Sequence, residues 1–154
     1  MGWFGHAILV LGIGMMTNML VHISAHATEP LDAYAWEKRI LIVFSPSDTD
    51  DRLIAQRAMN VASLGGLQER DMAIFSVLPE ALIAELGPLP DGDPQIVAAT
   101  LRETYTIPDD SFYVVLVGKD GDEKARIEST LPPVVLFDII DAMPMRQREM
   151  TQPE

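Results

Sequence analysis

The sequence has 154 residues, a net charge of -12 and no cysteine. A chain of this length corresponds to one domain, with a core large enough to fold without disulfides or a structural metal. The excess of acidic residues argues against nucleic acid as a partner, because proteins bind nucleic acid largely by neutralising its phosphates with lysine and arginine. It favours basic partners and cations, although an acidic surface is also a common way to stay solvated.

The first 27 residues are predicted to be a signal peptide. No formally charged side chain occurs from Trp3 to Ile23, and Ala25-His26-Ala27 follows, the small-x-small pattern that signal peptidase recognises. We therefore expect cleavage after Ala27 and export of the remainder. The alternative is an uncleaved membrane anchor, because about 20 apolar residues can span a bilayer. Against it, Thr17, Asn18 and His22 interrupt the stretch, and the chain does not supply the lysine or arginine that flanks an anchor. A lipoprotein is excluded, since there is no cysteine to acylate.

Residues 28–154 are expected to form a single domain that begins with a βαβ unit. The run Ile40–Phe44 is continuous, apolar and largely β-branched, which is typical of a strand buried on both faces. Helical spacing of apolar residues follows, and Gly65-Gly66 is expected to stop this helix near Ser63. A second strand, Met72–Val77, comes after this crossover, so we expect it to pair in parallel with the first.

The middle of the chain is predicted to be helical. We expect a short helix around Glu80 to Leu86, then the turn-rich segment 87–93, then a helix that Pro94 opens and that ends near Tyr105. Both helices are expected to cover one face of the sheet.

The C-terminal part is predicted to hold a β-hairpin and a last helix. A third strand, Phe112–Val117, leads into a turn over 119–122 and a partner strand from Lys124 to Glu128. Pro132-Pro133 then introduces an apolar-striped helix that Pro144 ends or kinks. The order β-α-β, helices, β-hairpin, α predicts an α/β fold with a central mixed sheet and helices on both faces.

That order is typical of the thioredoxin fold, and four short segments carry a narrower pattern. They are Trp36-Glu37-Lys38-Arg39, Glu69-Arg70-Asp71, Gly118-Lys119-Asp120-Gly121 and Asp141-Ala142-Met143-Pro144-Met145-Arg146-Gln147-Arg148-Glu149-Met150. With these segments the chain resembles the DUDES family of thioredoxin-like domains over about 31–150. The resemblance implies membership of a prokaryotic branch of small exported domains, related to domains of secreted vertebrate matrix proteins. The family has no established activity.

The residues that carry this resemblance are Trp36, Arg70, Asp71, Gly118, Lys119, Asp120, Gly121, Asp141, Met143, Pro144, Met145, Arg146, Glu149 and Met150. Arg146, Arg148 and Glu149 follow a helix C-terminus, where they are expected to anchor the tail by pairing with acidic neighbours. As a functional alternative, the segment Met145–Met150 is a candidate partner-binding patch, because it offers basic and flexible apolar groups on an acidic protein.

A candidate pocket is expected at the end of the first strand. In redox-active thioredoxin relatives a nucleophilic cysteine sits there, at a helix N-terminus that lowers the pKa of its thiol. The chain has Ser45-Pro46-Ser47 at this place, so the redox chemistry does not carry over. Ser45, Ser47 and Asp48 form the candidate pocket, and Pro108 is the nearest counterpart of the thioredoxin cis-proline. No catalytic residue is assigned.

The residue inventory also excludes several chemistries. All three histidines, His6, His22 and His26, lie in the predicted signal peptide. Without imidazole or thiolate, the mature domain has no Ser-His or Cys-His pair and no zinc site built on those ligands. We therefore expect no metal and no cofactor.

One set of potential oxygen ligands and one set of potential sulfur ligands are expected to have structural roles rather than to bind metal. The first set, at the start of the first helix, is expected to stabilise the helix dipole rather than bind a hard cation. The second is expected to pack rather than bind copper(I). These sets are Asp48, Asp50 and Asp51, and Met143, Met145 and Met150.

The sequence thus predicts an exported, non-redox, thioredoxin-like domain that binds an unidentified protein partner in the cell envelope. One alternative is a cysteine-independent hydrolase or transferase that uses Ser45 or Ser47 with carboxylates. Another is an accessory to peroxide or thiol metabolism that contacts a redox protein. No membrane contact is expected after signal cleavage, and the sequence does not define the oligomeric state.

Overall fold

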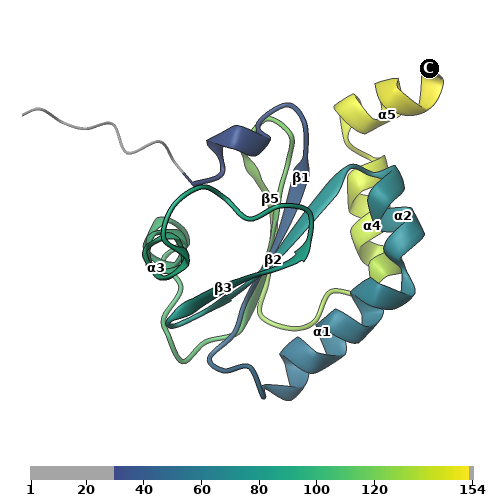
Figure 1. The fold of residues 1–154 in the computed structure, drawn as a ribbon. Helices are drawn as coiled ribbons and strands as arrows, with labels where there is room; N and C mark the ends of the chain where they lie inside the picture. The colour runs from purple at the N-terminus through teal and green to yellow at the C-terminus, as the bar shows by residue number, and fades with distance from the viewer. Residues whose placement is uncertain (1–29, 153–154) are drawn as a thin grey trace, which may run out of the picture.

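A computed structural model describes residues 30–152, and the predicted signal peptide with its cleavage site lies outside them (Figure 1). The elements, in chain order, are η1 (Asp32–Tyr34), β1 (Arg39–Phe44), α1 (Asp51–Ala62), α2 (Leu64–Glu69), β2 (Met72–Leu78), β3 (Ala81–Leu86), α3 (Pro94–Tyr105), β4 (Tyr113–Val117), β5 (Glu123–Ile127), α4 (Pro133–Asp141) and α5 (Pro144–Thr151). Within this described part, none of the helices has the length and apolar character needed to cross a bilayer.

Five strands form one sheet in the order β3-β2-β1-β4-β5. The first two strands pair in parallel, with Ile40 opposite Ala73, and the remaining neighbours pair antiparallel. The α/β class, the mixed central sheet and the parallel pairing of the first two strands are therefore confirmed. All six residues of β1 are buried, as expected for a central strand with both faces covered.

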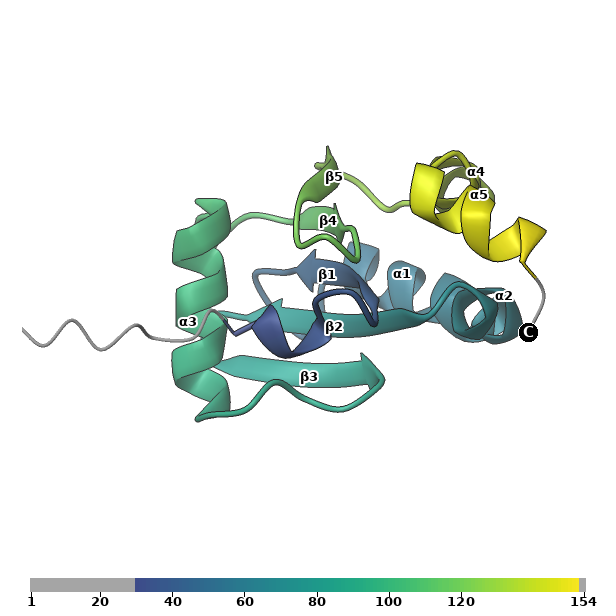
Figure 2. The same ribbon diagram turned by 90° about the horizontal axis from the view of Figure 1, so that it is seen from above.

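The two faces of β1 serve separate cores, because successive side chains of a strand point to opposite faces. Ile40, Ile42 and Phe44 pack with the apolar residues of α3, whereas Leu41 and Val43 pack with those of α1, α2 and α4. Figure 2 shows this layering, with α3 on one side of the sheet and the other four α-helices opposite. The expectation of helices on both faces is confirmed.

The helix predicted around Glu80 to Leu86 is wrong, since residues Ala81–Leu86 form strand β3. β3 pairs antiparallel with β2 through a tight turn at Pro79 and Glu80. Alanine, leucine and glutamate favour helices locally, but pairing with the exposed edge of β2 outweighs this propensity.

The role assigned to Gly65-Gly66 is also wrong. The first helix does end at Ala62, but both glycines lie inside a second helix, α2. A Cβ on Gly66 would come within 2.8 Å of the Phe137 ring, whereas a Cβ on Gly65 would meet nothing within 4 Å. Gly66 therefore permits the close approach of α2 to α4.

The predicted helix over Pro94–Tyr105 has the bounds of α3, capped by the Asp93 side chain, which accepts hydrogen bonds from the N–H groups of Gln95 and Ile96. The predicted hairpin is β4–β5. Helix α4 ends at Asp141, shortly before Pro144, as expected. Pro144 then begins a separate helix, α5, where only a tail was predicted.

Candidate functional site

The residues of the predicted pocket lie at the C-terminal end of β1, where their side chains form hydrogen bonds with neighbouring residues. Ser45 is fully buried, and its hydroxyl donates to the carbonyl of Ser47 over 2.9 Å. The Ser47 hydroxyl lies 3.3 Å from that of Thr49, and Asp48 accepts from Arg57 over 2.7 Å. Among the described residues, neither serine hydroxyl has a lysine or a carboxylate within hydrogen-bond distance.

A buried arginine that sequence reasoning missed holds this end of the sheet together. The Arg102 guanidinium donates to the carbonyls of Ser45 over 2.7 Å, Val77 over 3.0 Å and Pro108 over 2.9 Å. Burial lowers the pKa of Arg102, and Asp109 at 3.6 Å only partly opposes this effect. The available signal was a cation within the apolar stripe of α3, but two of its three carbonyl partners, Ser45 and Val77, lie on distant segments.

The peptide bond before Pro108 is trans, since residues 30–152 contain no cis peptide bond, so Pro108 does not share the cis geometry of the thioredoxin proline. Asp50 is the residue that caps α1, through a 2.8 Å hydrogen bond from the Arg52 N–H. In the described part of the chain, no group of three or more carboxylates is placed to hold a metal ion.

The four segments of the family resemblance converge at the opposite end of the sheet, which we call the motif end. Arg39 begins β1, Asp71 directly precedes the parallel strand β2, and Lys119 lies two residues after the end of the antiparallel strand β4. Helix α5 packs across this end. The topology of the sheet therefore brings together residues that lie up to 110 positions apart, such as Arg39 and Glu149.

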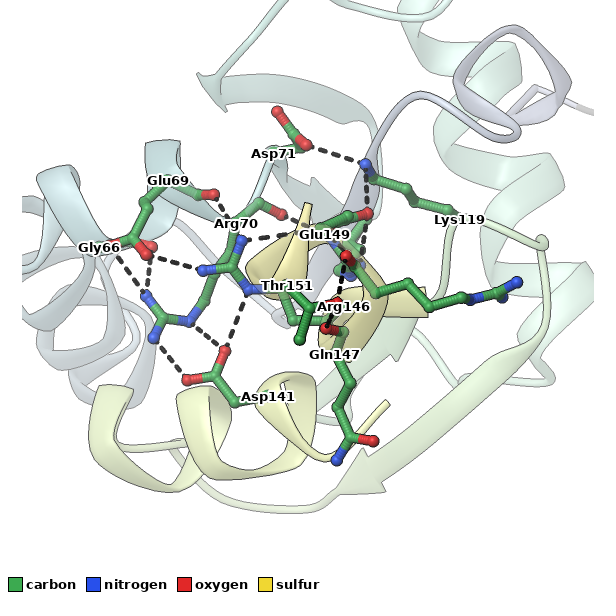
Figure 3. Close-up of polar contacts among 12 residues, drawn as sticks. Gly66, Glu69, Arg70, Asp71, Lys119, Asp141, Arg146, Gln147, Glu149 and Thr151 are labelled. Carbon is green, nitrogen blue, oxygen red and sulfur yellow. Dashed lines mark hydrogen bonds and ion pairs between the residues drawn. The ribbon is translucent and has the colours of Figure 1, made fainter. Parts of the chain in front are cut away.

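An ion-pair network joins these segments (Figure 3). The carboxylate of Glu149 accepts from Arg39 over 3.1 Å and from Lys119 over 2.8 Å, and Lys119 also donates to Asp71 over 2.8 Å. Burial alone would raise the pKa of Glu149, but the hydrogen bonds from Lys119 and Arg39 outweigh it and lower the pKa. Arg39 is only 1% exposed, so the pairing with Glu149 compensates the cost of burying its charge.

The second half of the network fastens α4 and α5 to α2. Arg70 donates two hydrogen bonds, of 2.9 and 2.6 Å, to the Asp141 carboxylate. Arg146 donates to Asp141 over 3.3 Å and to the carboxylate of Glu69 over 2.7 Å. The pKa of Asp141 is lowered, chiefly by the hydrogen bond from Arg70 and further by Arg146. Figure 3 shows both guanidinium groups directed toward this carboxylate.

The structure shows which side chains of the predicted patch over Met145–Met150 face solvent and which face the network. Arg146 is buried in the network and Glu149 faces it, so neither is presented to a partner. Arg148 is exposed, Met150 is 49% exposed and Met145 is half-buried. The outward-facing part of the segment therefore consists of two methionines, Gln147 and Arg148.

A cavity of about 210 Å³ opens beside the network, between the hairpin turn and the α4–α5 junction. Its lining residues are Arg39, Gly118, Lys119, Asp120, Lys124, Met143, Pro144, Met145 and Arg148. A Cβ on Gly118 would come within 2.5 Å of Lys124 and 2.6 Å of Asp120, so glycine leaves room for these two side chains to pair. We call this cavity the motif pocket.

Arg148 differs from every other lysine and arginine of the chain. Each of the others has a carboxylate within ion-pair distance. Among the described residues Arg148 has no such partner, and its Nε donates only to the carbonyl of Pro144, over 3.3 Å. In a chain with 23 acidic and 11 basic residues, an arginine without a carboxylate is available for a ligand.

Trp36 stands exposed beside the hairpin turn. The residue is 68% exposed, and its main-chain N–H donates to the carbonyl of Lys119. Its φ of 68° lies in the left-handed region. This conformation costs a residue other than glycine roughly 1–2 kcal/mol. A strained backbone that displays a large aromatic side chain in solvent is a feature found at functional surfaces.

Solved structures place the chain in the thioredoxin fold. It is similar to a thioredoxin peroxidase of Plasmodium yoelii, with a TM-score of 0.55 and 15% identity over 77% of this chain and 80% of that one. It is also similar to the reduced 2-Cys peroxiredoxin of Plasmodium vivax, with a TM-score of 0.56 and 14% identity over 77% and 84%. At such identities the likeness concerns the fold alone.

Within that fold the chain belongs to the family described as a domain of unknown function, DUF4174, whose model matches residues 30–149. It is 34% identical over 122 residues to human sushi repeat-containing protein SRPX, covering 78% of this chain and 26% of that protein. It is 25% identical over 134 residues to coiled-coil domain-containing protein 80 of Danio rerio, covering 78% and 15%. The chain thus corresponds to a minor part of these relatives.

Proposed function

We propose that the chain is an exported, redox-inert thioredoxin-like module of the DUDES prokaryotic branch that binds a protein partner through the motif end. The observation that carries this proposal is the convergence of four separate segments into one network beside a pocket. The apolar leader supports export, because its pattern is that of a signal peptide.

The opposite end of the sheet offers little for catalysis. The chain has no cysteine, so the position after β1 cannot cycle between thiol and disulfide. A serine nucleophile needs a base within hydrogen-bond reach, and the hydroxyl of Ser45 instead donates to a main-chain carbonyl. The geometry therefore gives no support to the serine-based enzyme.

The motif end has the composition of a binding surface. Tryptophan, methionine and arginine are enriched at the centres of protein interfaces, and Trp36, Met145 and Arg148 lie around the motif pocket and its turn. The network fixes the backbone on which these side chains stand. A surface held rigid before binding loses less entropy on association.

The test is affinity capture from an envelope extract with wild-type protein and two variants. Met145→Asp places a charge in the motif pocket, and Ile96→Asp is the matched control, since Ile96 is 67% exposed on α3 on the other side of the sheet. We expect a partner that Met145→Asp loses and Ile96→Asp retains. Identical partners for wild type and both variants would remove the motif end as the binding surface.

A further inference from the structure

We infer that the motif pocket binds a carboxylate group carried by the protein partner. This inference rests on the proposed function and adds the chemistry of the ligand. It follows from the charge of the pocket lining, from the pairing state of each cation and from the size of the cavity.

The pocket is basic on a strongly acidic molecule. Its lining includes four cationic residues, Arg39, Lys119, Lys124 and Arg148, but only one carboxylate, Asp120. The whole chain has 23 acidic and 11 basic residues, so the lining reverses the overall balance. Arg148 is the lining cation that no carboxylate of the described residues neutralises, and a concave site with low-dielectric walls strengthens the attraction of such a charge for an anion.

The cations of the lining have different roles. Glu149 binds Arg39 and Lys119, and Asp120 binds Lys124 over 2.6 Å, so carboxylates largely neutralise the charge of these three cations. Arg148 retains its two terminal nitrogens, since its only hydrogen bond within the described residues uses Nε. A guanidinium with both terminal nitrogens available matches the two oxygens of a carboxylate.

The size of the cavity limits the ligand. At about 210 Å³ it is smaller than the roughly 300–1,000 Å³ of sites that hold drug-sized ligands. It therefore fits one side chain or one chain terminus of a partner rather than a nucleotide or a cofactor. Met143, Pro144 and Met145 form an apolar wall, which suits the short aliphatic stem of an acidic residue.

Three short acetylated peptides provide the test, titrated into the purified ¹⁵N-labelled protein with chemical shifts as the readout. The first, Leu-Glu-Leu amide, carries a side-chain carboxylate. The second, Leu-Gln-Leu free acid, carries only a terminal carboxylate. The third, Leu-Gln-Leu amide, carries none. We expect saturable shifts centred on Gly118–Asp120 and Met143–Arg148 with the first or second peptide, which identifies the source of the carboxylate, and at least about tenfold weaker binding of the third.

Arg148→Gln is expected to weaken binding of the carboxylate peptide about tenfold, whereas Arg52→Gln, which removes an exposed arginine on α1, leaves it unchanged. Equal binding of all three peptides, or full affinity in Arg148→Gln, would overturn the inference. If no carboxylate peptide binds while Met145→Asp still abolishes capture, the inference fails and the proposed function stands.

Discussion

At the scale of single residues, Trp36 is the clearest conflict between local preference and the folded state. Its backbone is left-handed although its side chain is large, and most of that side chain contacts solvent. Packing therefore does not compensate for the strain at this position. Residues that cost stability in this way are expected where function requires them.

Replacing Trp36 with glycine is expected to stabilise the protein. Glycine adopts a positive φ without the steric penalty, so the free energy of unfolding should rise by about 1 kcal/mol and the melting temperature by roughly 4 °C. Calorimetry measures both. Trp36→Ala is the control, because alanine loses the side chain but keeps the strain. If alanine stabilises as much as glycine, the cost lies in the exposed ring and not in the backbone.

The single residues of the site differ in how far sequence could place them. Ser45 and Ser47 could be placed at the end of a strand, because the apolar run before them is unambiguous. Arg102 could not, since its role depends on the carbonyls of Ser45 and Val77, which belong to other segments. Arg146 pairs with acidic neighbours as expected, but its burial was not predicted, because a tail was predicted where the chain forms α5.

At the scale of elements, the failures of prediction occur where tertiary contacts outweigh local propensity. The segment Ala81–Leu86 consists of residues that favour helices, yet it completes the edge of the sheet beside β2. The diglycine in α2 should break a helix, yet the packing of Phe137 against Gly66 favours it. By contrast, α3 was predicted correctly because its cap residue and first-turn proline are local signals.

The two glycines of α2 offer a matched pair of substitutions with opposite expected signs. Gly66→Ala would force the Phe137 ring to move and should destabilise by about 1–3 kcal/mol, the usual cost of overpacking. Gly65→Ala adds a Cβ in open space within a helix and should stabilise by about 0.5–1 kcal/mol. Urea denaturation measures both changes. Stabilisation of similar size in both variants would show that helix propensity, and not contact with α4, governs this segment.

At the scale of the whole molecule, the sequence predicted the layers but not the meeting point of its motifs. The periodicities were sufficient for a mixed sheet with helices on both faces, because each element carries its own pattern. That Arg39, Lys119 and Glu149 meet at one end follows only from the strand order and from the position of α5. The family resemblance pointed to these segments, and the fold brings them into contact through the ion-pair network.

The network should make the stability of the molecule depend on pH in the acid range. The pKa of Asp141 is lowered in the folded protein, mainly by the hydrogen bond from Arg70, and hydrogen bonds from Lys119 and Arg39 lower that of Glu149 against the effect of burial. A carboxyl group with a lowered folded pKa stabilises the fold above its unfolded pKa, near 4. This contribution is lost as the pH falls through the folded value.

Asp141→Asn tests this linkage directly. At pH 7 the variant should be less stable by about 1–3 kcal/mol, because Arg70 and the buried Arg146 lose a charged acceptor. Its free energy of unfolding, followed by urea denaturation from about pH 7 to pH 3, should fall less steeply below pH 4 than that of wild type. Asp138→Asn is the control, since Asp138 is exposed on the same helix. A variant at Asp141 that keeps the full acid slope would show that the ionised carboxylate of Asp141 does not hold α4 and α5 to α2.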